Sequence, residues 1–198
     1  MKKKIVLLIS ILLISITAFG VTAGWDSTLT KTITGNTGGL DVIWDSSLNA
    51  GGTITDSHLW NINIVNMYPG QNVIFKSKQK NVGTMPVLFD TSQVNLDGLD
   101  EEIKDVIKLT FNVYKVDGSN SIIGATPNPI TCSLRNLKTN LDTLLNGMEL
   151  NVNEGVMIGD VTFGQSLGRI GMDPGATNNT MNKTINTTID LRWKQAPI

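Results

Sequence analysis

Residues 185–193 read INTTIDLRW, and this stretch decides the fold class. Its side chains fall into two alternating rows, with Ile185, Thr187, Ile189, Leu191 and Trp193 in one and Asn186, Thr188, Asp190 and Arg192 in the other. Successive side chains of a β-strand point to opposite faces of its sheet. This period of two therefore predicts a strand with one buried face.

Much of the chain before that strand carries the same pattern. Residues 58–67 set Trp60, Ile62 and Ile64 against asparagines, and residues 107–113 alternate in the same way. Shorter strands are predicted at 28–34, 40–44, 73–77, 86–89, 121–123 and 155–163. Turn-forming Gly, Pro, Asn and Asp residues separate them. Many short strands divided by turns favour an antiparallel β-sandwich.

Two segments have helical rather than strand patterns. Residues 99–106 carry acidic side chains near their start, which suits a helix N-terminus. In residues 137–145 the leucines recur at helical spacing, and Gly147 follows as a stop signal. The predicted fold class is thus all-β with two short helices.

The N-terminus has the three parts of a secretory signal peptide. A methionine and three lysines precede an apolar run at residues 5–19, and small residues follow it. Val21 and Ala23 fit the −3 and −1 positions of a signal-peptidase site, which predicts cleavage between Ala23 and Gly24. The alternative is an uncleaved anchor, but a spanning helix needs about 20 apolar residues and this run is shorter.

We expect signal peptidase to remove residues 1–23 and to leave residues 24–198 as one secreted domain, extracellular or associated with the cell surface. Loss of the three N-terminal lysines leaves 13 cationic against 17 acidic side chains, a net charge of −4. No basic run follows Lys4, so nucleic acid and anionic membranes are unfavourable partners. No second apolar segment follows either, so no stable membrane span is expected after cleavage.

Few residues offer catalytic chemistry. His58 is the only histidine, which excludes an HExxH zinc site and any scheme with two imidazoles. Cys132 is the only cysteine; it either lies buried, forms a disulfide with a second subunit, or acts with His58 as a Cys-His pair. We expect a buried thiol, no cofactor and no enzyme activity.

Two weaker patterns stay open. Loop carboxylates could hold calcium, although their spacing does not match an EF-hand. They are Asp41, Asp45, Asp56, Asp97 and Asp100. Asn178, Asn182 and Asn186 begin glycosylation-type sequons, which matter only if the source organism glycosylates exported proteins.

Several stretches, in order, resemble the TasA/camelysin family of secreted β-sandwich proteins. They are GVTAGWDS at 20–27, GGLDV at 38–42, INIVNMYPGQ at 62–71, NVGT at 81–84 and TTIDLRW at 187–193. The chain departs from the family at Trp25, where phenylalanine is commoner, and the helix at 137–145 has no family motif. The resemblance implies a jelly-roll sandwich that assembles into extracellular fibres of a biofilm matrix or a cell-surface filament.

In that family the mature N-terminal strand can leave its own subunit and complete the sheet of the next. Residues 24–34 are the candidate donor strand here, with Trp25, Leu29, Thr32 and Ile33 as its assembly residues. The segment from Trp25 is free of Gly and Pro and nearly uncharged, which suits an added strand. The alternative is an ordinary first strand within its own domain. The implied partners are further copies of the chain and accessory matrix or anchoring proteins.

Two other functions remain as alternatives. A secreted carbohydrate- or surface-binding sandwich would present aromatic side chains to sugars, and Trp44, Trp60 and Trp193 are the candidates. The alternation around Trp60 and Trp193 instead predicts that both point inward. The second alternative is a secreted peptidase, since the resemblance extends to family members described as metallopeptidases. A single histidine gives that activity no support.

Overall fold

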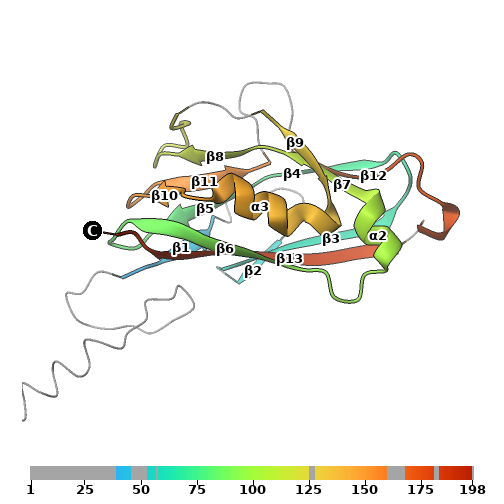
Figure 1. The fold of residues 1–198 in the computed structure, drawn as a ribbon, viewed down its shortest axis with the longest axis horizontal. Helices are drawn as coiled ribbons and strands as arrows, with labels where there is room; N and C mark the ends of the chain where they lie inside the picture. Colours follow the sequence, from blue (N-terminus) through green and yellow to red (C-terminus); the bar gives the residue numbers. More distant parts are fainter. Residues whose placement is uncertain are drawn as a thin grey trace, which may run out of the picture.

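The computed structural model describes residues 39–45, 53–56, 58–124, 128–159, 168–180 and 183–197. They form two packed layers of antiparallel strands, which confirms the predicted all-β, jelly-roll-like sandwich (Figure 1). The sheets are open rather than closed into a barrel. Among these residues no helix is long and apolar enough to cross a membrane.

The first layer is a five-stranded sheet with the order β10-β6-β13-β3-β2. Its strands are β10 (Glu149–Leu150), β6 (Val87–Asn95), β13 (Lys183–Gln195), β3 (Leu59–Met67) and β2 (Thr53–Asp56). β13 is the long central strand and contains the alternating stretch that predicted the fold class. Its inward row is buried and Trp193 pairs with Phe89 of β6, so the predicted orientation is confirmed.

The second layer consists of two four-stranded sheets, β1-β5-β11-β8 and β4-β12-β7-β9. Their strands are β1 (Val42–Trp44), β5 (Ser77–Asn81), β11 (Gly155–Ile158), β8 (Val113–Val116), β4 (Asn72–Phe75), β12 (Gly168–Met172), β7 (Ile107–Phe111) and β9 (Ile130–Ser133). Single residues, Lys76 and Asn112, separate β4 from β5 and β7 from β8. The two sheets therefore continue one another end to end and form a single layer.

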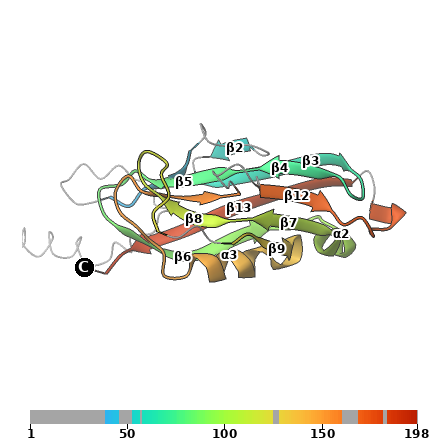
Figure 2. The same cartoon turned by 90° about the horizontal axis from the view of Figure 1, so that it is seen from above.

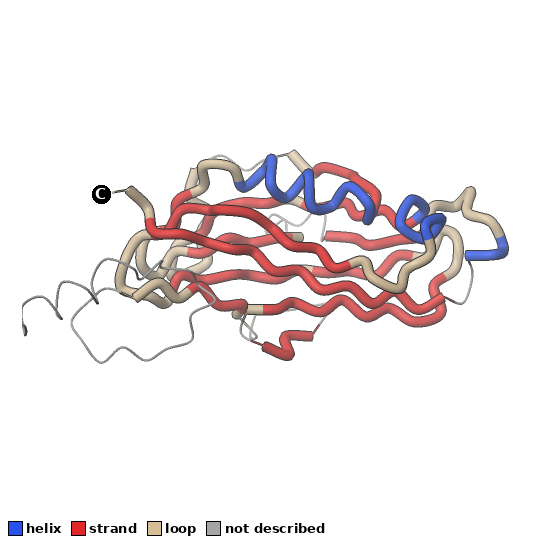
Figure 3. The backbone as a smooth tube through the Cα atoms, turned by 60° about the horizontal axis from the view of Figure 1, so that its bottom comes forward, coloured by secondary structure: helices blue, strands red, loops and turns tan. Residues whose placement is uncertain are grey.

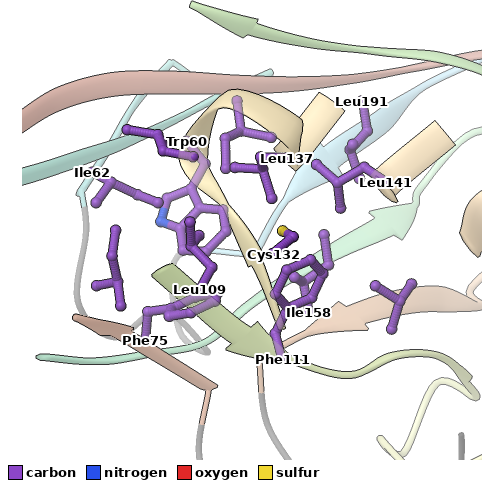
Figure 4. Packing of buried hydrophobic residues seen from close by; sticks show 14 of the residues in the cluster. Trp60, Ile62, Phe75, Leu109, Phe111, Cys132, Leu137, Leu141, Ile158 and Leu191 are labelled. Carbon is purple, nitrogen blue, oxygen red and sulfur yellow. The ribbon is translucent and has the colours of Figure 1, made fainter. Parts of the chain in front are cut away.

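The core fills the space between the two layers. Trp60 lies 5.4 Å from Trp44 and 5.6 Å from Phe75, measured between ring centroids, and Phe75 lies 6.1 Å from Phe111. This row of aromatic rings runs from β1 and β3 across to β7, and Figure 4 labels its members Trp60, Phe75 and Phe111. Aromatic pairs at such separations add to the stabilisation that burial alone provides.

Both predicted helices are present, together on one long side of the sandwich (Figure 3). Helix α2 spans Glu101–Val106, and α3 spans Leu137–Leu145 after the short 3₁₀ turn η2 (Leu134–Asn136). The leucines at 137, 141 and 145 are buried, as the helical spacing predicted. α3 thus packs its apolar face onto the core beside β6 and β9 (Figure 2).

The structure corrects two strand predictions. The strand predicted at 155–163 ends at Ile158, because Gly159 has a φ of +95° and a Cβ there would lie 2.5 Å from the carbonyl oxygen of Phe75. The strand predicted at 121–123 is reduced to one bridge between Val116 and Ile122. The strand predicted at 28–34 lies outside the described residues.

Candidate functional site: the open side of the sandwich

One long side of the sandwich is closed by α3. Beyond its short pairing with β10, the edge strand β6 has a backbone N–H at Ser92 that donates to Asp142 Oδ1 of α3 at 2.7 Å. The Ser92 hydroxyl donates to the same oxygen at 2.7 Å and Lys138 Nζ donates to Asp142 Oδ2 at 2.5 Å. A carboxylate therefore takes the place of a neighbouring strand and satisfies the edge.

The carboxylate of Asp142 is held in its charged form. Desolvation raises its pKa, but the hydrogen bonds from Lys138 and Ser92 outweigh that effect and keep the pKa below the ordinary aspartate value. Next to it, Arg135 of η2 bonds to Asp105 at 2.6 Å and to Glu101 at 2.7 Å. Since both acids belong to α2, this pairing joins the two helices that cover this side.

The opposite long side, called the open side below, has strand edges that no described strand covers. Strand β3 pairs with β13 along its length, but β2 reaches only from Leu59 to Asn61. Within the described residues, β3 from Ile62 to Met67 has no strand on its other edge. In the facing layer, β4 pairs with β12 and has no second neighbour among those residues either. Figure 2 shows β3 and β4 together on the side away from α3.

The open edge of β3 carries an irregularity and exposed apolar side chains. The register against β13 shifts near Asn66, which has a φ of +57°, so β3 contains a bulge there. Val65 beside the bulge is 60% exposed, and Ile74 on β4 is 47% exposed. An edge with unpaired backbone and exposed apolar side chains favours pairing with another chain, although a bulge limits its length.

Two buried polar groups near the open side lack hydrogen-bond partners within the described part of the chain. They are Trp60 Nε1, on β3, and Ser77 Oγ, at the start of β5. Trp60 packs between Trp44 of β1 and Phe75 of β4, so its indole lies on the side of the core nearest the open edges. Buried polar groups are normally hydrogen-bonded. An added acceptor for Trp60 Nε1, or an added partner for Ser77 Oγ, would therefore be stabilising.

The first described residues are anchored at one end of the sandwich. Val82 and Gly83 donate their N–H groups to the Asp41 carbonyl at 2.8 and 3.0 Å, and Thr84 N–H donates to the Gly39 carbonyl at 3.0 Å. A Cβ at Gly83 would lie 2.4 Å from the Gly39 oxygen, so this close approach requires glycine. The NVGT stretch therefore fixes the point from which the N-terminal segment departs.

The predicted cleavage and assembly residues belong to the N-terminal segment that precedes Gly39. The cleavage site at Ala23 and Gly24 and the candidate donor residues Trp25, Leu29, Thr32 and Ile33 all lie outside the described residues. What the sequence analysis missed is the acceptor side. The exposed Val65-Asn66 dipeptide inside an otherwise alternating strand was the available signal.

The acidic residues proposed for calcium do not come together. Asp41 lies 3.7 Å from His58 Nε2, and Asp100 lies 3.3 Å from Lys183 Nζ. In the part of the chain that the structure describes, no three His, Cys, Asp or Glu side chains form a group that could hold a metal ion.

The remaining candidates for chemistry are buried in the core. Desolvation raises the pKa of the Cys132 thiol to about 11, so little of the reactive thiolate exists at neutral pH. Cys132 lies among core side chains, as Figure 4 shows. Trp44, Trp60 and Trp193 are 2%, 0% and 2% exposed, which confirms the inward prediction for the last two. None of the three presents a ring to a sugar.

Comparisons with protein-family models, curated proteins and solved structures return no match for this chain. The similarity to the TasA/camelysin family therefore stays a resemblance carried by the sequence stretches above.

Proposed function

We propose that this protein is a structural subunit of an extracellular fibre or biofilm matrix, assembled when residues 24–34 of one copy add as a strand to the open side of the next. The observation that carries this proposal is the difference between the two long sides. α3 and Asp142 close one side, whereas the edges of β3 and β4 have no described neighbour on the other.

Strand addition supplies what the open side lacks. The backbone groups of an incoming strand bond to the free edge, and alternate side chains enter the space behind it. Trp25, Leu29 and Ile33 are separated by even numbers of residues, so an extended strand would hold them on one face and Thr32 on the other. The buried Trp60 Nε1 adds a donor to which a backbone carbonyl of the added strand could bond.

The reach of the segment also supports assembly. Residues 24–38 precede the anchored Gly39, and at about 3.3 Å per residue they span up to about 50 Å when extended. That length suffices to reach a neighbouring subunit. Because the donor and the acceptor are different surfaces, the contact is head-to-tail and repeats along a filament. Self-association is the principal partnership, with accessory or anchoring proteins at filament ends.

The decisive experiment compares two secreted-length forms, residues 24–198 and residues 35–198, by negative-stain electron microscopy and size-exclusion chromatography. We expect filaments from the longer form and folded monomers from the shorter one. Circular dichroism confirms that the shorter form is folded. Polymerisation of the 35–198 form would overturn the strand-addition mechanism.

A peptide experiment separates the strand from other effects of truncation. A synthetic peptide of residues 24–34 should bind the 35–198 form and stop filament growth by the longer form. A scrambled peptide of the same composition is the matched control, since it preserves hydrophobicity and charge. Equal inhibition by both peptides would show that the effect is not pairing of a specific strand.

A further inference from the structure

The outer face of the β4-β12-β7-β9 sheet contains a hollow of about 340 Å³. Its lining includes Asn72, Lys108, Thr110, Arg169, Gly171 and Asp173. Pockets that bind small molecules begin at about 300 Å³. The hollow therefore has room for one unit of a small ligand rather than for an extended peptide.

The strand register explains how the hollow forms. Gly171 on β12 lies between Asn72 on β4 and Lys108 on β7, and Arg169 is on the same face of β12, opposite Thr110. A Cβ at position 171 would lie 2.0 Å from Asn72 Oδ1, so a larger residue there would displace the exposed Asn72 side chain. The missing side chain leaves a depression in the sheet between the two basic residues.

Two cations, Lys108 and Arg169, line this depression. Lys108 is half-buried and Arg169 is exposed, and neither forms an ion pair with any carboxylate in the described part of the chain. By contrast, many other basic residues of the described structure are paired, Arg135, Lys115 and Lys194 among them. Asp173 at the rim accepts a hydrogen bond from Gly175 N–H at 2.9 Å. With Lys108 and Arg169 against the single acid Asp173, the lining of the hollow has a net charge of +1.

Neutral hydrogen-bonding groups surround the cations. Thr131 and Ser133 of β9 lie directly across from Thr110 and Lys108, and Thr110 and Thr131 share a hydrogen bond of 2.9 Å. The turn that supplies Gly70 also carries Tyr68, which is 46% exposed. The hollow thus combines a pair of cations with hydroxyl and amide groups, and an exposed aromatic ring lies nearby. This combination suits a ligand that has many hydroxyl groups and one acidic group.

We infer that this hollow binds a carboxylated sugar residue of an acidic polysaccharide. Arg169 and Lys108 hold the carboxylate, since a guanidinium can bond to both of its oxygens. Asn72 and Thr110 are placed to bond to ring hydroxyls. The site lies on a face that strand addition at the β3 and β4 edges leaves free. Binding at this site does not require a filament, so the inference is independent of the proposed function.

Affinity electrophoresis of the 24–198 form tests this inference, with polygalacturonate as the acidic probe and dextran as the neutral one. We expect retardation by polygalacturonate alone, weakened by added salt. The double variant Lys108→Ala/Arg169→Ala should lose at least about tenfold in affinity, which corresponds to about 1.4 kcal/mol, because both charge-assisted hydrogen bonds to the carboxylate are removed.

The matched control is Lys183→Ala/Lys194→Ala. It also removes two cations, both from exposed ion pairs on β13. It should keep the affinity of the unmodified protein. Equal losses in both double variants would reveal non-specific charge attraction and overturn the inference, as would absence of binding to polygalacturonate. The double variant Lys108→Ala/Arg169→Ala could instead abolish filaments and leave the binding of polygalacturonate unchanged. The hollow would then be a contact between subunits, and the inference would also be wrong.

Discussion

The two long sides of this sandwich solve the edge problem of β-sheets in opposite ways. At β6, a helix lies along the edge and the Asp142 carboxylate accepts the Ser92 N–H. At β3, the edge from Ile62 to Met67 has no strand neighbour among the described residues, and it contains a bulge at Asn66 and an exposed Val65. An unpaired edge is an aggregation hazard that proteins usually remove. The strand-addition proposal rests on this contrast between the two sides.

The largest effect on stability is expected from Leu141→Ala, which removes a buried side chain between α3 and the core. Truncating a buried leucine to alanine costs about 2–5 kcal/mol in the free energy of unfolding. Urea denaturation measures the loss. Leu144→Ala is the matched control, since Leu144 is only partly buried and should cost less. Equal losses would mean that α3 does not seal this side through its buried face.

Asp142→Ala should cost about 1–3 kcal/mol in the free energy of unfolding, because it leaves the buried Ser92 N–H without its acceptor. Asp142→Asn keeps an acceptor oxygen and should cost less. Asp90→Ala, which breaks an exposed pair with Lys194, should cost at most about 0.5 kcal/mol. If the two aspartates proved equally costly in urea titrations, the edge-closing role of Asp142 would be refuted.

The covered side should also be the one that acid weakens. Desolvation raises the pKa values of Asp142 and Glu154, but their hydrogen bonds hold both below the ordinary values. A carboxylate with a lowered folded-state pKa stabilises the fold above its unfolded value, about 4, and loses that contribution as the pH falls through the folded value.

The urea concentration at the midpoint of unfolding should therefore decrease as the pH is lowered from 5 to 3. The decrease should be smaller in Asp142→Asn than in the unmodified protein. Glu154→Gln should flatten the same curve through its pair with Lys115. If the urea midpoint depended on pH in both variants as it does in the unmodified protein, the acid sensitivity would arise elsewhere in the molecule.

The smallest effect on stability is expected from Val65→Lys on the open edge. An exposed substitution of this kind changes the free energy of unfolding by at most about 0.5 kcal/mol. A lysine on an edge opposes strand pairing, so filaments should be absent in electron micrographs. Val152→Lys is the control, because Val152 is exposed in the turn between β10 and β11. Normal filaments from Val65→Lys would exclude β3 as the acceptor.

The elements of this fold were largely predictable, whereas their partners were not. Period-two alternation identified β3, β7 and β13, and leucine spacing identified α3, because burial of one face leaves a local pattern. Pairing is different, since β11 lies between β5 and β8, which are distant in the sequence. No local pattern encodes which distant strands meet.

The donor segment at residues 24–34 stays a prediction, because it lies outside the described residues. The acceptor side could not be predicted from local sequence, because it depends on which strand edges remain unpaired after folding. The hollow at Gly171 was equally hidden, since Arg169 and Lys108 are far apart in sequence and meet only through the β12-β7 register. Such sites follow from topology rather than from any motif.

The covered side has a consequence for how much material this protein can build. Under the proposed strand addition, a subunit with one donor segment and one acceptor side would be a bifunctional monomer in the sense of polymer chemistry, and it would yield linear chains without branches. A copy that lacks residues 24–34 would then be a chain terminator at one end. Where association runs to completion, the proportion of such copies would set the mean filament length.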